Sequence, residues 1–364
     1  MADVSATQQG LRVAVVGCGI IGRRRAGVVR STGTDEVVVV ADLDGERAKG
    51  TARDLGCEAT TSWRDAVRRD DVDAVIVATT HNWLAAVAAE ALRSRKHVLV
   101  EKPMARDPSE ARSILDAAGG CGGDGQVVKV GFNHRHHPAV WKAHALVCQG
   151  EIGEPCFIRC RYGHGGRPGY AAEWRMDREV AGGGELLDQG IHAIDLCRWF
   201  LGEFVEAVGF TATYVWTPPV IDPGVAPVED NAFGLFRTAR GHVASVHASW
   251  TQWKNLFSYE VFGRDGYLVA EGLGRSYGPE RLTIGRRRPE SGPPEERHFE
   301  FPGEDTSWTA EWLEFTAAVR EHREPLASGY DGWQALRAAH ALYESARTGR
   351  TVRLDAEAPG LPRA

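Results

Sequence analysis

The sequence predicts a protein of two domains, an α/β domain followed by an α+β domain with a large open, mainly antiparallel sheet. In the first third, continuous apolar runs alternate with helical segments, which is typical of a parallel sheet covered on both faces. After about residue 133, strands dominate and alternate polar with apolar residues, as in a sheet with one covered face. The length of 364 residues agrees with two domains.

The expected domains cover residues 10–133 and 134–354, with tails at 1–9 and 355–364. In the first domain, helices separate strands expected at 11–16, 36–41, 73–79, 97–101 and 127–132. In the second, Pro138 opens a helix that ends near Gly150. Strands then follow at 157–161, 207–215, 232–237, 243–250, 259–263 and 281–284, before two closing helices at 308–322 and 332–347.

Composition and charge exclude several classes of partner. The formal net charge of -6 gives no reason to expect nucleic acid. No window approaches the roughly 20 apolar residues of a membrane-spanning helix, and the N-terminus lacks the pattern of a signal peptide. The 7 cysteines include no Cys-x-x-Cys pair, which fits a reducing compartment. We therefore expect a cytoplasmic protein without nucleic-acid or membrane partners.

A glycine motif, Gly17-x-Gly19-x-x-Gly22, follows the first strand and opens the first helix. The first glycine allows the tight turn, the second lets a pyrophosphate approach the backbone, and the third lets the helix pack on the strand. The helix N-terminus then offers N–H donors to the phosphates. A plain glycine turn is the alternative, but the strand–loop–helix context indicates a Rossmann dinucleotide-binding domain in which Ile20 and Ile21 also contact the cofactor.

An acidic residue, Asp42, ends the second strand twenty residues after Gly22. A carboxylate there accepts hydrogen bonds from ribose hydroxyls and repels a 2′-phosphate, which favours NAD over NADP. Asp42 is also a good turn residue in its local sequence. Arg47 and the basic run Arg23–Arg25 keep NADP open, although a solvated helix face is the simplest interpretation of that run.

Two segments at strand ends are candidates for cofactor and substrate contacts. Glu101-Lys102-Pro103 follows the fourth strand, at the sheet edge where ligands bind in open α/β sheets. A lysine there can stabilise a developing alkoxide. Thr79 ends the third strand, and His81 and Trp83 follow it. All three are expected near the nicotinamide or its ribose, with a simple helix start as the alternative for 81–83.

A glycine-rich stretch, 182–195, carries the remaining chemistry. Its three glycines are expected to bring a loop close to something large or flat. A helix is expected to follow, with Asp188, His192 and Asp195 on one face. His192 can take a hydroxyl proton as a hydride leaves, and Asp188 can orient it or bind a hydroxyl. For Asp195 the simpler interpretation is a buried group that anchors the helix.

The sequence resembles the glucose-fructose oxidoreductase, inositol dehydrogenase and rhizopine-catabolism (Gfo/Idh/MocA) family over about residues 11–354. The motifs that carry the resemblance are the glycine loop, Asp42, Glu101-Lys102-Pro103 and Gly184-x-x-x-Asp188-x-x-x-His192. It implies that Lys102 is the catalytic lysine, His192 the general acid/base, and Asp188 a substrate-binding member of the catalytic group. It also implies a homo-oligomer, a dimer or tetramer, formed through the open sheet.

Polar and aromatic residues elsewhere are candidate substrate contacts. Asn133 and Arg135 follow the fifth strand at the domain junction, where family members place such contacts. Tyr162, Trp174 and Arg175 precede the glycine-rich stretch, and core or loop roles are equally open for them. Although 133–137 holds three histidines, we expect no metal site, because no cysteine or carboxylate set completes a ligand shell.

The resemblance implies an NAD-dependent, inositol-dehydrogenase-like oxidoreductase. It would move a hydride between nicotinamide and a secondary ring hydroxyl or ketone of a cyclitol, sugar or sugar derivative. Three alternatives stay open: an NADP-dependent reductase of keto-sugars on a nucleotide carrier, a glycosidase-like enzyme that retains NAD, and a dinucleotide-binding sensor without turnover. Asp42 argues against the first, and the presence of both Lys102 and His192 argues against the last.

Overall fold

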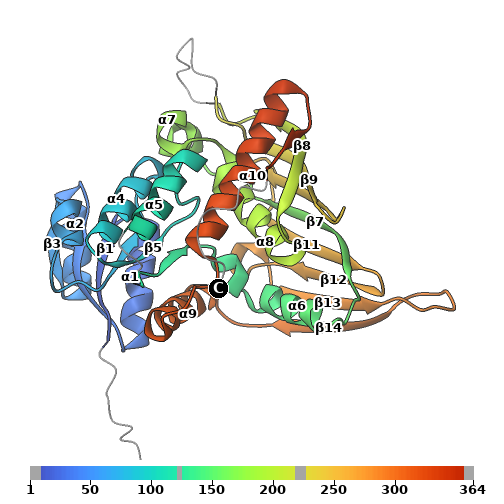
Figure 1. Ribbon diagram of the computed structural model, residues 1–364, viewed down its shortest axis with the longest axis horizontal. Coiled ribbons are helices and arrows are strands. Elements are labelled where there is room, and N and C mark those ends of the chain that lie inside the picture. The colour runs from blue at the N-terminus through green and yellow to red at the C-terminus, as the bar shows by residue number, and fades with distance from the viewer. Residues whose placement is uncertain (1–9, 121–124, 218–226, 356–364) are drawn as a thin grey trace, which may run out of the picture. The chain divides into compact units, whose positions relative to one another are not determined.

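The computed structural model describes residues 10–120, 125–217 and 227–355, which form two compact units (Figure 1). The first unit comprises the described parts of Met1–Met104, Arg112–Gly131 and Trp308–Gly329. The second comprises those of Ala105–Ala111, Phe132–Ser307 and Tyr330–Ala364. The predicted tails lie outside the described residues, apart from residue 355.

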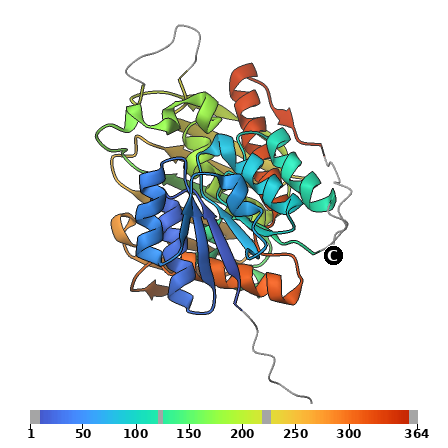
Figure 2. The same ribbon diagram turned by 90° about the vertical axis from the view of Figure 1, so that its left-hand side faces the viewer.

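The first unit is built on a six-stranded parallel sheet with the order β3-β2-β1-β4-β5-β6. The strands are β1 (Arg12–Val16), β2 (Glu36–Ala41), β3 (Glu58–Thr60), β4 (Ala74–Val77), β5 (His97–Val100) and β6 (Val128–Val130). The helices are α1 (Ile20–Thr32), α2 (Gly45–Leu55), α3 (Trp63–Val67), α4 (His81–Arg93), α5 (Pro108–Gly120) and α9 (Ser307–Glu321). Figure 2 shows helices on both sides of the blue strands. The predicted parallel α/β fold is confirmed.

Helix α9 corrects the predicted domain assignment, which gave all residues after 133 to the second domain. Trp312 and Phe315 of α9 are buried in the same apolar cluster as Val13, Val15 and Ile76 of the parallel sheet. The indole N–H of Trp312 donates to Asp35 over 3.0 Å. A helix from the far end of the chain therefore completes the core of the first unit, and helical periodicity alone does not indicate which sheet an amphipathic helix covers.

The second unit is built on a nine-stranded sheet with the order β14-β13-β12-β11-β7-β10-β9-β8-β15. The strands are β7 (Pro155–Gly163), β8 (Phe204–Ala212), β9 (Asn231–Thr238), β10 (Val243–Ser249), β11 (Leu256–Gly263), β12 (Gly266–Glu271), β13 (Glu280–Arg286), β14 (Glu295–Phe301) and β15 (Val352–Arg353). Every pairing is antiparallel except that between β7 and β10. The predicted mainly antiparallel sheet is confirmed, although β12, β14 and β15 were not predicted.

Three helices pack on one face of this sheet: α6 (Pro138–Cys148), α8 (Ile191–Leu201) and α10 (Gly329–Thr348) (Figure 1). Short turns complete the unit: η1 (Asn133–His136), η2 (Tyr170–Ala172), η3 (Trp174–Met176), α7 (Arg178–Ala181), η4 (Leu186–Gly190) and η5 (Arg275–Tyr277). Side chains along β7 and β9 alternate between buried and exposed. The alternation leaves large apolar side chains exposed on the other face, among them Phe157, Phe210, Phe233 and Leu235.

Candidate functional site

The glycine loop between β1 and α1 has the backbone that the motif requires. Gly17 has φ +98°, a conformation that other residues rarely adopt, and an added Cβ there would lie 2.4 Å from the carbonyl oxygen of Ala78. A Cβ on Gly22 would lie 1.7 Å from the carbonyl oxygen of Gly17. A Cβ on Gly19, by contrast, would meet nothing within 4 Å. The first and third glycines therefore serve the turn and the packing, and the second leaves open space over the backbone.

Asp42 holds the glycine loop with its carboxylate. Its Oδ2 accepts the backbone N–H of Cys18 over 2.8 Å, and its Oδ1 accepts that of Asp44 over 2.9 Å. The guanidinium of Arg47 lies 3.5 Å from Oδ1. Asp42 thus has the turn role that the sequence left open, and each carboxylate oxygen has a further lone pair for a ribose hydroxyl.

Glu101 and Lys102 follow β5, and Glu101 belongs to a buried ion network. Nε of Arg25 donates to Glu101 over 2.7 Å, and another guanidinium nitrogen of Arg25 contacts Glu311 of α9. The side chain of Arg25 is 2% exposed, so the solvated helix face expected for the run Arg23–Arg25 is wrong at its third residue. Burial raises the pKa of Glu311, and Arg25 opposes that rise. The network fixes the residue that precedes Lys102.

The other predicted cofactor residues of the first unit lie just after β4 and in the first turns of α1 and α4. Thr79 is half-buried, His81 is buried as the first residue of α4, and Trp83 is 39% exposed. Ile20 is 75% exposed at the start of α1. These positions leave Ile20 and Trp83 accessible to a ligand of the first unit.

In the second unit, Asp188 and His192 lie on either side of a change in helix type. The sequence predicts one regular helix, but η4 is a π-helical turn that contains Asp188, and α8 begins only at Ile191. Such π turns occur frequently at functional sites. The prediction of one regular helix over Asp188, His192 and Asp195 is therefore wrong at its first turn, where the backbone is π-helical.

His192 lies among aromatic rings and is buried. Its ring stacks on that of His134 with centroids 3.9 Å apart and planes 27° apart. Phe132 approaches His192 edge-on at 5.7 Å, and Tyr162 at 6.4 Å. Burial raises the pKa of the Tyr162 phenol well above its usual range, so Tyr162 stays a hydrogen-bond donor at neutral pH. The structure thus brings the predicted residues Tyr162 and His192 together.

Asp188 is paired with another predicted residue, Arg175. Nε of Arg175 lies 3.2 Å from Oδ2 of Asp188, and its Nη1 lies 3.1 Å from Glu173. The same guanidinium lies 4.7 Å from the ring centroid of Trp174. Arg175 therefore pairs with Asp188 and links η3 to η4.

Asn133 and Arg135 have internal partners rather than exposed polar ends. The amide of Asn133 donates to Ser307 over 2.9 Å. Arg135 forms two hydrogen bonds with Asp195, of 2.8 and 2.6 Å, and contacts Asp331 at 3.2 Å. The interpretation of Asp195 as a buried anchor is confirmed. The sequence could not reveal Asp331 of α10, the second carboxylate that Arg135 contacts.

The glycine-rich stretch approaches the protein's own chain. An added Cβ on Gly184 would lie 2.0 Å from the carbonyl oxygen of Glu229, and one on Gly183 would lie 2.2 Å from the hydroxyl of Tyr343. The Glu229 carboxylate accepts the N–H groups of Gly184 and Leu186 and the hydroxyl of Tyr343. The large object that these glycines accommodate is thus Glu229 with its partners, which no sequence motif indicated.

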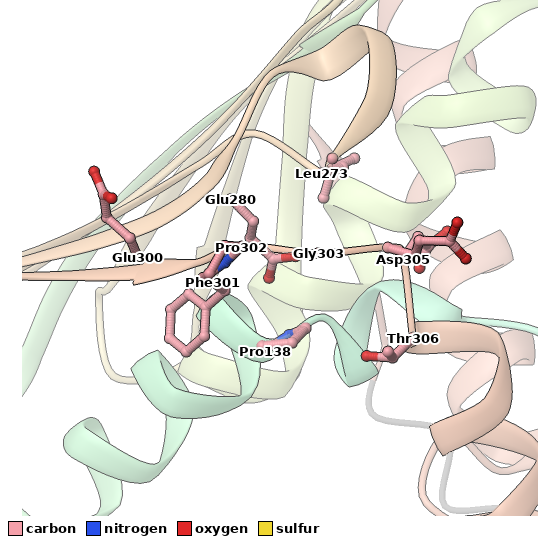
Figure 3. A pocket seen from close by; sticks show the side chains of 11 residues that line it. Pro138, Leu273, Glu280, Glu300, Phe301, Pro302, Gly303, Asp305 and Thr306 are labelled. Carbon is pink, nitrogen blue, oxygen red and sulfur yellow. The ribbon is translucent and has the colours of Figure 1, made fainter.

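A separate cavity of about 250 Å³ in the second unit is lined by acidic side chains (Figure 3). Glu280, Glu300, Glu304 and Asp305 lie around it, and no residue predicted for catalysis does. Among the described residues, no group of three or more His, Cys, Asp or Glu side chains is arranged to hold a metal ion. None of the described helices is long and apolar enough to cross a membrane.

Comparison with known families assigns both units. Residues 11–131 match the oxidoreductase family with an NAD-binding Rossmann fold, and residues 140–269 match the GFO/IDH/MocA C-terminal domain. The chain belongs to the GFO/IDH/MocA family. The resemblance that the sequence motifs indicated is confirmed, and this GFO/IDH/MocA protein is an NAD(P)-dependent oxidoreductase.

Relatives of this GFO/IDH/MocA protein include sugar and polyol enzymes. The 1,5-anhydro-D-fructose reductase of Ensifer adhaerens is 30% identical over 350 residues, 94% of this chain and 98% of the relative. The inositol 2-dehydrogenase of Rubrobacter xylanophilus is 29% identical and covers 96% and 94% of the two chains. The solved complex of levoglucosan dehydrogenase with NADH and levoglucosan has a TM-score of 0.85 at 25% identity and covers 95% of this chain and 99% of that one.

The residues of this GFO/IDH/MocA protein fit a dinucleotide at the glycine loop. The open space over Gly19 is what a pyrophosphate needs in order to reach the backbone. The first turn of α1 contains no acidic residue, and Gly19 brings no capping side chain, so its N–H groups face no competing anion from the helix itself. Residues 17–22 would thus hold the phosphates, and Asp42 the adenosine ribose.

Proposed function

We propose that this protein is an NAD-dependent dehydrogenase that acts on a secondary ring hydroxyl of a cyclitol, sugar or sugar derivative. The observation that carries the proposal is the presence, in a chain of this family, of Lys102 after β5 and of Asp188 and His192 in η4 and α8. Relatives named for inositol, levoglucosan and 1,5-anhydrofructose all act on ring polyols or their ketones, which supports the substrate class.

In the proposed reaction, bound NAD supplies the hydride acceptor. The ammonium of Lys102 holds the reacting oxygen and stabilises its developing negative charge. His192 accepts the hydroxyl proton at its imidazole, and returns it in the reverse direction. Asp188, held by Arg175, accepts a hydrogen bond from a neighbouring hydroxyl. Tyr162, whose ring lies 6.4 Å from that of His192, would border the substrate.

The test compares Lys102→Ala with Lys49→Ala, a lysine of the same unit that is 65% exposed at the surface. NADH binding is followed by nicotinamide fluorescence, and turnover by NADH absorbance with a panel of inositols, free sugars and anhydrosugars. We expect Lys102→Ala to bind NADH like the parent while kcat falls by about 10²- to 10³-fold. If kcat of Lys102→Ala stays within a few fold of the parent's, Lys102 has no part in the mechanism. If the parent binds NADH but converts no compound in the panel, the alternative of a dinucleotide-binding sensor without turnover is favoured.

The cofactor part of the proposal rests on Asp42. Its carboxylate would repel the 2′-phosphate of NADP, so the protein should bind NADH more tightly than NADPH. Asp42→Ser removes that repulsion, so the ratio of the dissociation constant for NADPH to that for NADH should fall toward one. If the parent protein binds NADPH more tightly than NADH, the interpretation as an NADP-dependent keto-sugar reductase is favoured instead.

A second candidate is the reduction of a keto-sugar as the physiological direction. Two relatives favour it, the 1,5-anhydro-D-fructose reductase and a dTDP-sugar 3-reductase of Streptomyces violaceoruber, which is 28% identical. Lys102 and His192 would play the same parts in reverse. Turnover of a ketone with NADH, without turnover of the matching alcohol near neutral pH, would identify this direction. Several turnovers without added nucleotide would point to a retained-NAD, glycosidase-like reaction.

We also propose that the open face of the nine-stranded sheet forms a homo-oligomer. Phe210 pairs in register with Phe233, Val208 with Leu235, and Val243 with Phe157, so apolar side chains form rows on that face. Phe210 is 72% exposed and Leu235 is 48% exposed. Phe210→Glu should lower the mass found by sedimentation from that of a dimer or tetramer. A parent chain that sediments as a monomer would contradict the proposal.

A further inference from the structure

The stacked histidines His134 and His192 lie in one apolar cage of the second unit. Their ring centroids are 3.9 Å apart. Both side chains are buried, each with 5% of its surface exposed. The rings of Phe257 and Tyr162 approach His134 at 5.8 and 5.1 Å, and Phe132 closes the side of His192. Two imidazoles are therefore held face to face where little water screens them.

The geometry makes the protonation of one imidazole depend on the other. A positive charge within about 4–6 Å disfavours a second one, and burial strengthens the effect. Nδ1 of His134 lies 3.2 Å from Oδ1 of Asn133, an acceptor that suits an N–H at this position and stabilises a protonated His134. Asn133 is itself anchored by Ser307, so its oxygen is fixed toward His134.

The other ionisable groups on the surrounding elements are largely matched with partners of their own. Arg135 is neutralised by Asp195 and Asp331, and His137 faces Glu280 at 3.1 Å. Asp188 is paired with Arg175, and the phenol of Tyr277 accepts a hydrogen bond from Gln189. Tyr162 of β7 borders both rings, and Glu185 is buried at the start of η4. The ring of His134 is thus a titratable group that stacks directly on His192.

We propose that His134 is a positioning residue that lowers the proton affinity of His192, so that the stacked pair holds at most one proton near neutral pH. His192 then remains a neutral base when the substrate hydroxyl must lose its proton. The ring of His134 also fixes the plane of the His192 ring by stacking. The inference deepens the proposed function and rests on it for the role of His192, but the coupling of the two rings can be measured without any substrate.

The test follows the histidine ring resonances by NMR from pH 4 to 9 in the parent, in His134→Phe and in a control, His136→Phe. Phenylalanine keeps an aromatic ring on His192 and removes the ionisable group. His136 is buried on the same turn but stacks on Trp141 instead. His192→Gln identifies the resonance of His192. We expect the midpoint of His192 to rise by about one to three pH units in His134→Phe and to stay unchanged in His136→Phe.

Activity provides a second readout. In His134→Phe, the acidic limb of kcat/KM for alcohol oxidation should move to higher pH by the same amount as the NMR midpoint, with NADH affinity unchanged. An unchanged His192 midpoint in a folded His134→Phe protein would overturn the inference. If that variant does not fold, the titration of the parent protein tests the inference by itself. The midpoints of His134 and His192 must then differ by at least about one pH unit, and two independent midpoints near 6.5 would refute the coupling. Coupling without sugar turnover would leave the inference intact and contradict the proposed function alone.

Discussion

Replacing Arg25 with methionine should destabilise the protein through the carboxylates left behind. Arg25 is 2% exposed and bridges Glu101, 10% exposed, and Glu311, fully buried. Removing one partner of a buried ion network typically costs about 3–5 kcal/mol, because the remaining charge is uncompensated. Methionine fills a similar volume, so the loss of packing is small.

The pH dependence of that loss has a definite sign. Burial already raises the pKa of Glu311, and the loss of Arg25 would raise it further. A carboxyl group whose pKa is higher in the folded state binds its proton more readily there, so its contribution to stability falls as the pH rises through that folded pKa. The cost of Arg25→Met should therefore be larger at pH 8 than at pH 5.

The assay is urea unfolding followed by circular dichroism, with Arg23→Met as the matched control. Arg23 is exposed on the same helix, and its replacement should change the free energy of unfolding by less than about 0.5 kcal/mol. Adding Glu101→Gln and Glu311→Gln to Arg25→Met should recover most of the lost stability. If Arg25→Met proves no more costly than Arg23→Met, the reasoning about the buried network is wrong.

Three further predictions use other described residues. Gly22→Ala should abolish NADH binding and destabilise the first unit, because its Cβ would meet the Gly17 carbonyl at 1.7 Å. Gly27→Ala in the same helix has open space around its Cβ and should instead stabilise the protein by about 0.5–1 kcal/mol. Thermal unfolding and NADH titration check both variants. Burial lowers the pKa of His144 to about 4, so folding should lose stability as the pH falls from about 6.5 to 4. Because the ring is only partly buried and solvent screens its charge, we expect a loss on the order of 1 kcal/mol, which His144→Phe should flatten in urea curves. Tyr343→Phe should cost about 1–3 kcal/mol, because buried Glu229 loses its hydroxyl donor; a stability equal to the parent's would contradict the role given to that bond.

Local chemical requirements made the glycine loop predictable from sequence. A tight turn, a close phosphate and a helix packed on a strand need glycine at Gly17, Gly19 and Gly22, and each need arises within a few residues. The alternation along β7 and β9 likewise reflects two faces of one strand. The fold class followed from such local patterns.

Long-range partners explain what the sequence could not predict. The basic run Arg23–Arg25 looks solvated, and only the carboxylates of Glu101 and Glu311, 76 and 286 residues after Arg25, make burial of its third residue favourable. Asp195 could be assigned as an anchor, but its partner Arg135 lies 60 residues away. The π turn at Asp188 also escapes the 3.6-residue period on which helix prediction depends.

Helix α9 has a consequence for the order in which the chain can fold during synthesis. The ribosome releases residues 12–130, with all six parallel strands, long before Trp312 and Phe315 exist. Until then the surface that those two side chains cover stays exposed to water, and the carboxylate of Glu311 is missing beside Arg25. The core of the nascent dinucleotide-binding unit therefore stays incompletely packed while nearly 180 further residues, those between Gly131 and Trp308, are synthesised. A stop codon or protease cut shortly before α9 would remove only about the last sixth of the chain, yet it would damage the unit that was made first.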